Sequence, residues 1–294
     1  MEQSNNITQI IIDTINTIFQ NLFSSIDNNL YSTLDDITFV SSDILNDKNF
    51  ENLFGTNTSN GILLIANSLL LGFILFYSFK YLLSHLTYAE SEQPFRFILK
   101  LIIYGIFMNF SFFIIQYILD LNSNISLSIR NIGENLFGKN ICFSELINII
   151  NSSMSIESSS LDIFSLDGLI KCTLTMSLLN LIFSYSLRYI LIKVFVLLTP
   201  FAFISLTTNS TSWFFKTWFR NLFSLLFIQI VVSLILLILF SMDYTSSNLF
   251  IKFIYIGGIY ALIRANSFVN EFIGGISTNV TQCVNNFSTL KNIN

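Results

Sequence analysis

Polar residues recur at helical spacing along one otherwise apolar segment. They are Thr173, Ser177, Asn180, Ser184 and Arg188, whose spacing of four, three, four and four residues places them on one side of a helix. In one interpretation this stripe makes hydrogen bonds between helices, as such residues usually do inside membrane bundles. In the other interpretation the stripe borders a hydrated path, and Arg188 contacts an anionic substrate or its phosphate groups.

No catalytic motif accompanies the stripe. The single histidine, His85, has no evident metal partner, and phosphate-binding glycine loops, HExxH and GxSxG are absent. The three cysteines, Cys142, Cys172 and Cys283, lie far apart and form no CxxC pair, which argues against a zinc site and a thioredoxin motif. We therefore predict a protein that is not an enzyme and that holds no metal ion or cofactor.

The composition identifies the class of protein. Of 294 residues, 52% are hydrophobic and only 11% are charged, whereas soluble chains carry about 25% charged residues. Such a chain lacks the polar surface of a water-soluble globule, and long apolar runs favour helices because helices satisfy their own backbone groups in lipid. The sequence therefore predicts an all-α polytopic membrane protein, and its net charge of −4 argues against a broadly basic nucleic-acid surface.

Five segments are predicted to cross the membrane, because a hydrocarbon core of about 30 Å needs about 20 helical residues. They are residues 61–79, 97–119, 169–198, 222–240 and the shorter, glycine-interrupted 249–263. The region 169–206 also allows two short spans divided at Arg188. If residues 169–198 form one span, the chain has five spans, with its N-terminus outside and its C-terminus inside. Nine basic residues then lie inside and five outside, and the positive-inside rule favours this topology over the one with two short spans.

This topology divides the chain into five parts in the cytoplasmic membrane. They are an extracytoplasmic N-terminal segment (1–60), a first transmembrane hairpin (61–119), an extracytoplasmic loop (120–168), a three-helix core (169–264) and a short cytoplasmic tail (265–294). Apolar residues at three- and four-residue spacing between Ile7 and Ile37 predict an amphipathic helix in the first part. This helix either packs on the rest of the protein or contacts the membrane surface or another subunit.

The link between the third and fourth predicted spans carries a proline, aromatic residues and cations. Pro200 removes a backbone donor and is expected to end or kink the third helix. Both tryptophans, Trp213 and Trp218, alternate with Lys216 and Arg220, which is typical of anchors at a headgroup layer; stacking on a substrate is the alternative.

Small residues recur every four positions in the last predicted span. Gly257, Ala261 and Ala265 form a face that permits close approach of another helix, in the same chain or in another subunit.

These same regions carry a family resemblance. The apolar-Pro-apolar turn at Pro200, the stretch WFFKTWFRNLFSLLFIQ and the closing RANSFVNEFIGGIST resemble the polytopic channel subunit of type IV secretion systems, the TrbL-type conjugal transfer proteins of Gram-positive bacteria. The resemblance covers residues 169–278 clearly, and the upstream half in layout. Relatives are described with the same outer N-terminus, five spans and inner C-terminus, but many have longer tails than this chain.

The resemblance implies a function and partners. It implies a membrane channel or scaffold subunit that helps to pass a DNA–protein substrate across the cytoplasmic membrane, in a homo-oligomer with a secretion ATPase, a coupling protein and other channel subunits. The alternative is the permease subunit of an ATP-driven exporter. A third hypothesis is an anchoring protein without a transport path.

Overall fold

The computed structural model describes residues 10, 13–15, 17–18, 33–56, 60–87, 93–153, 166–242 and 249–274, and every regular element in them is helical. A short helix covers residues 33–38. The elements that follow are η1 (Ser42–Leu45), α2 (Lys48–Phe54), α3 (Ile62–Thr87), α4 (Pro94–Asn109), α5 (Ser111–Phe137), α6 (Phe143–Ser153), α7 (Leu166–Ser205), α8 (Ser212–Phe240) and α9 (Leu249–Ile273).

Four of these helices are long and apolar enough to cross a membrane. They are Ile62–Leu86, Ser111–Phe137, Gly168–Ser205 and Ser212–Phe240. The predicted fold class, an all-α polytopic membrane protein, is therefore confirmed. The fifth predicted span forms helix α9 at the expected place, but α9 is not among the four, so the count of five remains a prediction.

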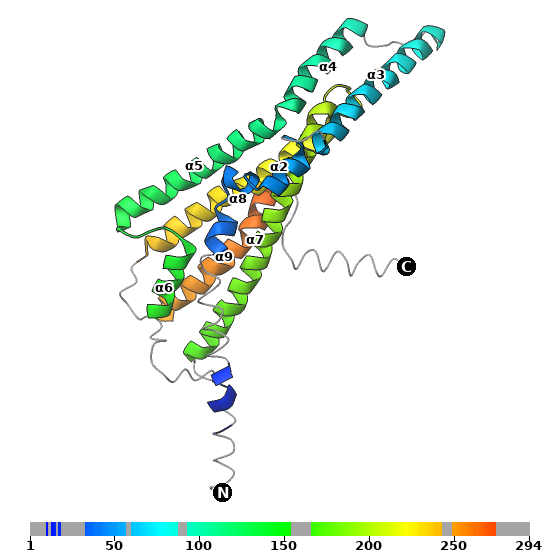
Figure 1. Cartoon of the computed structure of the whole chain (residues 1–294). Coiled ribbons are helices and arrows are strands. Elements are labelled where there is room, and N and C mark those ends of the chain that lie inside the picture. Colours follow the sequence, from blue (N-terminus) through cyan, green and yellow to red (C-terminus); the bar gives the residue numbers. More distant parts are fainter. Residues whose placement is uncertain are drawn as a thin grey trace.

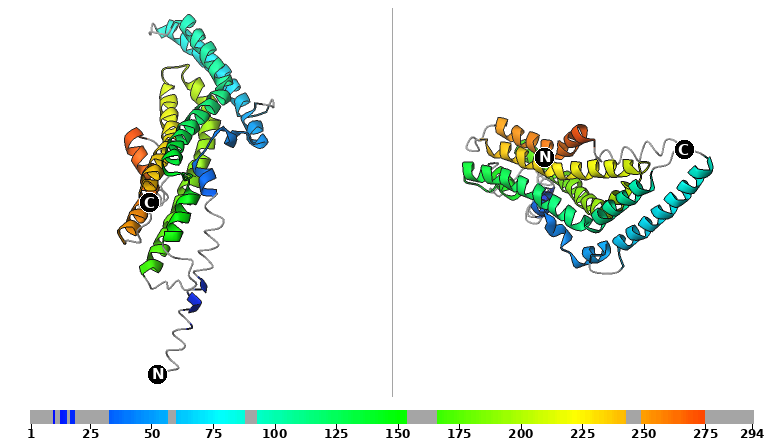
Figure 2. Two further views of the ribbon diagram at one scale, coloured as in Figure 1. Left: turned by 90° about the vertical axis from the view of Figure 1, so that its left-hand side faces the viewer. Right: turned by 90° about the horizontal axis from the view of Figure 1, so that it is seen from above.

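Helix α8 is the centre of the bundle. It packs against α5, α7 and α9, and the views in Figures 1 and 2 show these long helices side by side. The α3–α4 hairpin projects from this bundle and contacts it mainly through α7. Large apolar side chains cover the hairpin, including Phe79 at 70% exposure and Leu86 at 76%. Such a surface is suited to lipid, because lipid tails impose no penalty on exposed apolar groups.

The predicted second span has the wrong boundaries. Residues 97–119 fall across α4 and α5, which meet at Phe110, and α5 continues to Phe137 before Gly138 caps it with a positive φ of 65°. The first part of the predicted loop, residues 120–137, is therefore helical. Polar residues such as Asn122 and Ser126 lower its hydropathy, but both are buried against the bundle instead of facing water.

The sequence led us to expect that Pro200 ends or kinks the third helix. The helix does not end there, because α7 continues through Pro200 to Ser205. A proline costs the helix one backbone hydrogen bond, and packing with neighbouring helices can compensate. Trp218 of α8 donates its indole N–H to the carbonyl oxygen of Phe195 at 2.8 Å, one turn before Pro200. This contact fixes α7 to α8 before the proline, and the rings of Trp218 and Phe203, 6.1 Å apart, pack together after it.

The N-terminal segment packs into the bundle over residues 34–54. Leu34, Val40, Leu45 and Phe54 are each no more than 1% exposed. Of these four residues, Leu34 alone belongs to the predicted amphipathic helix, and Ile18 on its predicted apolar face is 59% exposed. Packing of that helix on the rest of the protein stays a prediction, because most of it before Thr33 lies outside the described residues. At the other end, α9 continues to Ile273 and so takes the first residues of the predicted tail.

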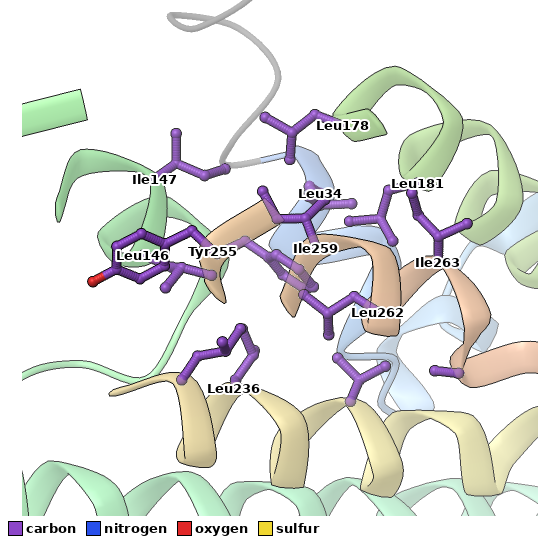
Figure 3. Close-up of a cluster of buried hydrophobic side chains, with 14 of the residues drawn as sticks. Leu34, Leu146, Ile147, Leu178, Leu181, Leu236, Tyr255, Ile259, Leu262 and Ile263 are labelled. Atoms are coloured by element: carbon purple, nitrogen blue, oxygen red, sulfur yellow. The ribbon is translucent and has the colours of Figure 1, made fainter. Parts of the chain in front are cut away.

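Two large apolar clusters fill the interior. The first cluster, drawn in Figure 3, joins Leu34, α6, the first half of α7, the second half of α8, and α9. The second cluster joins residues 40–54, α5, the second half of α7 and the first half of α8. Helices α7 and α8 therefore run from one cluster to the other along their length.

Close packing of α9 on α8 depends on Gly258, one residue from the predicted Gly257. A Cβ atom added to Gly258 would lie 2.4 Å from Cδ2 of Leu239, whereas one added to Gly257 would meet nothing within 4 Å. Ala265 of the predicted small-residue face is buried, but Gly257 and Ala261 are exposed.

We predict opposite effects for substitutions at these adjacent glycines. Gly258→Val should lower the free energy of unfolding by about 1–3 kcal/mol, because the larger side chain pushes α9 away from Leu239. Gly257→Ala should leave it unchanged or raise it slightly, because alanine favours helix and has room there. Thermal unfolding of the purified proteins in detergent measures both. Equal stability of the two variants would contradict the packing described for α9.

Candidate functional site

The guanidinium of Arg188 lies at the centre of the bundle and is fully buried. Its Nε donates to the carbonyl oxygen of Leu225 at 2.7 Å, Nη1 to the carbonyl oxygen of Thr38 at 2.9 Å, and Nη2 to Oε1 of Gln229 at 3.4 Å. One side chain on α7 therefore holds both α8 and the N-terminal segment. The planar guanidinium suits this role, since its donors point in several fixed directions.

The side-chain oxygen of Gln229 is the second centre of this network. Besides Arg188, it accepts from the backbone N–H of Val40 at 3.2 Å and from the side-chain amide of Asn122 at 3.3 Å. One turn further along α8, Ser233 lies 2.7 Å from Ser126 of α5, hydroxyl to hydroxyl. These contacts add α5 to the elements that the network connects.

We name this network the polar layer, and it separates the two apolar clusters. Its members are Thr38, Asn122, Ser126, Arg188, Gln229 and Ser233. On α7 the first cluster ends at Tyr185 and the second begins at Ile192, with Arg188 between them. On α8 the second cluster ends at Leu226 and the first begins at Ile228, next to Gln229.

A second polar contact fixes the N-terminal segment to α6. The carboxylate of Asp35 accepts the backbone N–H groups of Phe143 and Ser144 at 2.8 and 3.1 Å, and the Ser144 hydroxyl at 2.6 Å. These are the first residues of α6, where a carboxylate satisfies otherwise unpaired donors. Arg130 of α5 lies over the ring of Phe39, 4.0 Å from its centroid, and so covers the same segment.

The thiol of Cys142 lies beside this contact, between α5 and α6. Burial raises its pKa above the ordinary value, and the carboxylates of Asp35 and Glu145 act in the same direction, against the backbone N–H of Glu145 and the charge of Arg130. A raised pKa leaves little thiolate at neutral pH, so we expect an unreactive cysteine.

The predicted stripe is brought together only in part. Ser184 and Arg188 are buried, Ser177 and Asn180 are half-buried, and Thr173 is exposed, with its hydroxyl donating to Leu169 of its own helix. The contacts of Arg188 support the interpretation as hydrogen bonding between helices, since all three guanidinium nitrogens have acceptors within the chain. A role of Thr173, Ser177 and Asn180 beside a path stays a prediction.

The two predicted tryptophan anchors differ in position. Trp213 is 64% exposed, and Lys216 and Arg220 are exposed as well, as anchors at a headgroup layer require. Trp218 is only 3% exposed and bonded to Phe195, so its assignment as a surface anchor is wrong. The reason is the helical period, which places Trp213 and Trp218 on different sides of α8.

Besides Arg188, the sequence also indicates Gln229 and Ser233, four residues apart in the predicted fourth span, as residues that face the same interior. The other three members of the polar layer were missed. Thr38 takes part through its backbone carbonyl, which no side-chain pattern reveals, and Asn122 and Ser126 lay in the predicted loop. Their spacing of four residues, continuous with the apolar helix before them, was the available signal. Elsewhere in the described part of the chain, no group of three His, Cys, Asp or Glu side chains could hold a metal ion.

We predict that Arg188→Leu lowers the free energy of unfolding by about 1–3 kcal/mol, the usual cost of leaving a buried acceptor unpaired. Arg188→Lys should also destabilise, because an ammonium cannot reach three acceptors arranged around a guanidinium. Thermal unfolding in detergent and protease cleavage within residues 33–45 measure the effect, with the exposed Arg264→Leu as the control. Unchanged stability combined with lost biological activity would instead assign Arg188 to a substrate path.

We also predict slow alkylation of Cys142 at pH 7, with a rate that still rises above pH 9. The measurement uses iodoacetamide and a chain with Cys172→Ser and Cys283→Ser. The matched control adds Cys142→Ser and Asn140→Cys, which places the thiol at an exposed position two residues away. Equal rates and equal pH profiles for the two thiols would contradict the burial of Cys142.

In comparisons with protein-family models, with curated proteins and with solved structures, nothing matches this chain.

Proposed function

We propose that this protein is a membrane-embedded, non-enzymatic subunit of a type IV secretion machine of the TrbL type, which helps to pass a DNA–protein substrate across the cytoplasmic membrane. The membrane-spanning helices support the general part of this proposal, a membrane protein. The sequence resemblance over residues 169–278 supports the particular machine.

One structural observation gives this proposal its main support. The two stretches that carry the resemblance, residues 213–229 and 264–278, contact each other in the fold over their described parts. The hydroxyl of Ser224 donates to Oδ1 of Asn270 at 3.0 Å, and Ala265 and Val269 are buried in the first cluster. The two stretches that carry the resemblance are therefore parts of one packed unit of α8 and α9.

The proposed orientation has the N-terminus outside and the C-terminus inside. The proposed partners are a secretion ATPase, a coupling protein and further copies of the chain. The exposed Gly257 and Ala261 on α9 offer a surface for such a copy, because small residues allow two helices to approach closely in lipid. The polar layer then holds the subunit together, and the substrate path runs between copies or partners.

The test is transfer frequency in mating. We expect an in-frame deletion to abolish transfer and the parent gene to restore it. Gly257→Leu with Ala261→Leu should reduce transfer at least tenfold while the folded protein stays in the membrane, because the exposed face is changed and the bundle is not. The control is Phe253→Leu, an exposed and nearly size-conserving change on the same helix.

Two results would contradict the proposal. Normal transfer from the deletion strain would remove the protein from the conjugation machine. Co-purification with one small ATPase, instead of a large multi-protein assembly, would favour the exporter permease.

A further inference from the structure

A polar cavity of about 400 Å³ lies where the α3–α4 hairpin meets the link between α7 and α8. Lys80 of α3 and Arg96 of α4 contribute two cations to its wall, and Thr208, Asn209 and Ser210 of the link contribute hydroxyl and amide groups. None of the described residues that line the cavity is a carboxylate. In a chain with a net charge of −4, two cations beside neutral donors form a distinct site for an anion.

The cavity walls are held in place by aromatic stacking in the hairpin and by hydrogen bonds in the α7–α8 link. The rings of Tyr77 on α3 and Phe97 on α4 stack in parallel at a centroid distance of 3.8 Å, and both residues line the cavity. On the link, the hydroxyls of Thr208 and Thr211 lie 2.7 Å apart, and Thr211 also donates to the carbonyl oxygen of Ser205. The polar groups are therefore presented by three connected elements.

A second cavity, of about 440 Å³, is apolar and shares Tyr77, Tyr81 and Phe97 with the polar cavity. Its other residues, such as Ile74, lie on the far side of the stacked rings from Lys80 and Arg96, so it is a separate cavity. The polar cavity has its own apolar neighbour, because Phe76 in its wall is 60% exposed. A ligand with an anionic head in the polar cavity can therefore lay hydrocarbon chains against the outside of the hairpin, a contact that a small inorganic anion would not use.

The position along the helices also fits a lipid headgroup. Lys80 lies six residues before the end of the apolar stretch Ile62–Leu86, where the long side chain of a lysine can reach the headgroup layer. Trp213, in the first turn of α8 just after the link, is exposed, as tryptophans at the headgroup layer are. Both observations place the polar cavity at the membrane surface.

We propose that the Lys80–Arg96 cavity binds the phosphate headgroup of an anionic phospholipid, with the acyl chains against the apolar α3–α4 surface. This inference does not depend on the secretion function. The bound lipid joins the projecting hairpin to the α7–α8 link, and so fixes an element that packs on the bundle mainly through α7.

The test measures binding of dioctanoyl phosphatidylglycerol and of inorganic phosphate to the full-length protein in a neutral detergent, by thermal shift and native mass spectrometry. Lys80→Gln with Arg96→Gln should weaken lipid binding about thirtyfold. At 1.4 kcal/mol per tenfold this is about 2 kcal/mol, or about 1 kcal/mol for each cation removed. Lys48→Gln with Arg264→Gln removes the same charge from exposed positions elsewhere and should leave binding unchanged.

Three other outcomes would contradict the proposal. Equal weakening by the two double variants would show attraction to overall charge, without a site. Inorganic phosphate that binds as tightly as the lipid would assign the cavity to a free phosphate. Unchanged binding in the Lys80 and Arg96 variant would exclude the cavity, and Asn209→Asp, which adds a negative charge to its wall, should then also have no effect.

Discussion

The burial of one guanidinium is the constraint on which the rest of this structure depends. Moving a charge out of water costs several kcal/mol unless acceptors surround it, so Arg188 can be buried only where acceptors are already in place. One of them, the carbonyl oxygen of Thr38, is open because the N–H group four residues later, on Ser42, donates to Asp120 of α5 instead of continuing the helix. The end of the short helix at 33–38 and the position of Arg188 are therefore two consequences of one arrangement.

The polar layer also explains why the helices adopt one register. In a membrane, hydrocarbon surfaces gain little by choosing one another over lipid, so apolar contacts alone allow helices to slide. The two apolar clusters are of this kind. Gln229 receives donors from three elements at once, from α5, α7 and the N-terminal segment, and a slide of any one of them by a turn would leave buried polar groups unpaired.

Hydropathy and spacing predicted the fold class and most helices, because those properties depend on local composition. They did not predict which side of a helix faces the interior. The stripe correctly grouped Ser184 with Arg188 but also included the exposed Thr173, and the small-residue face included Gly257 where Gly258 makes the contact. The end of α5 was missed for a related reason: Asn122 and Ser126 resemble loop residues until their partners on α8 are known. Partners distant in sequence decide these features, and no local pattern contains them.

The same contacts limit where this protein can act on anything else. The guanidinium of Arg188, the side-chain oxygen of Gln229 and the hydroxyl of Ser233 are fully buried and bonded to one another or to backbone groups of the same chain. A substrate could reach them only by separating α7 from α8, which would also release the N-terminal segment. Among the described residues, groups accessible without unfolding include those on the exposed face of α9 and at the junction of the hairpin with the α7–α8 link. The buried contacts of Arg188 and Gln229 are therefore suited to hold the helices together, and contact with a substrate would require them to break.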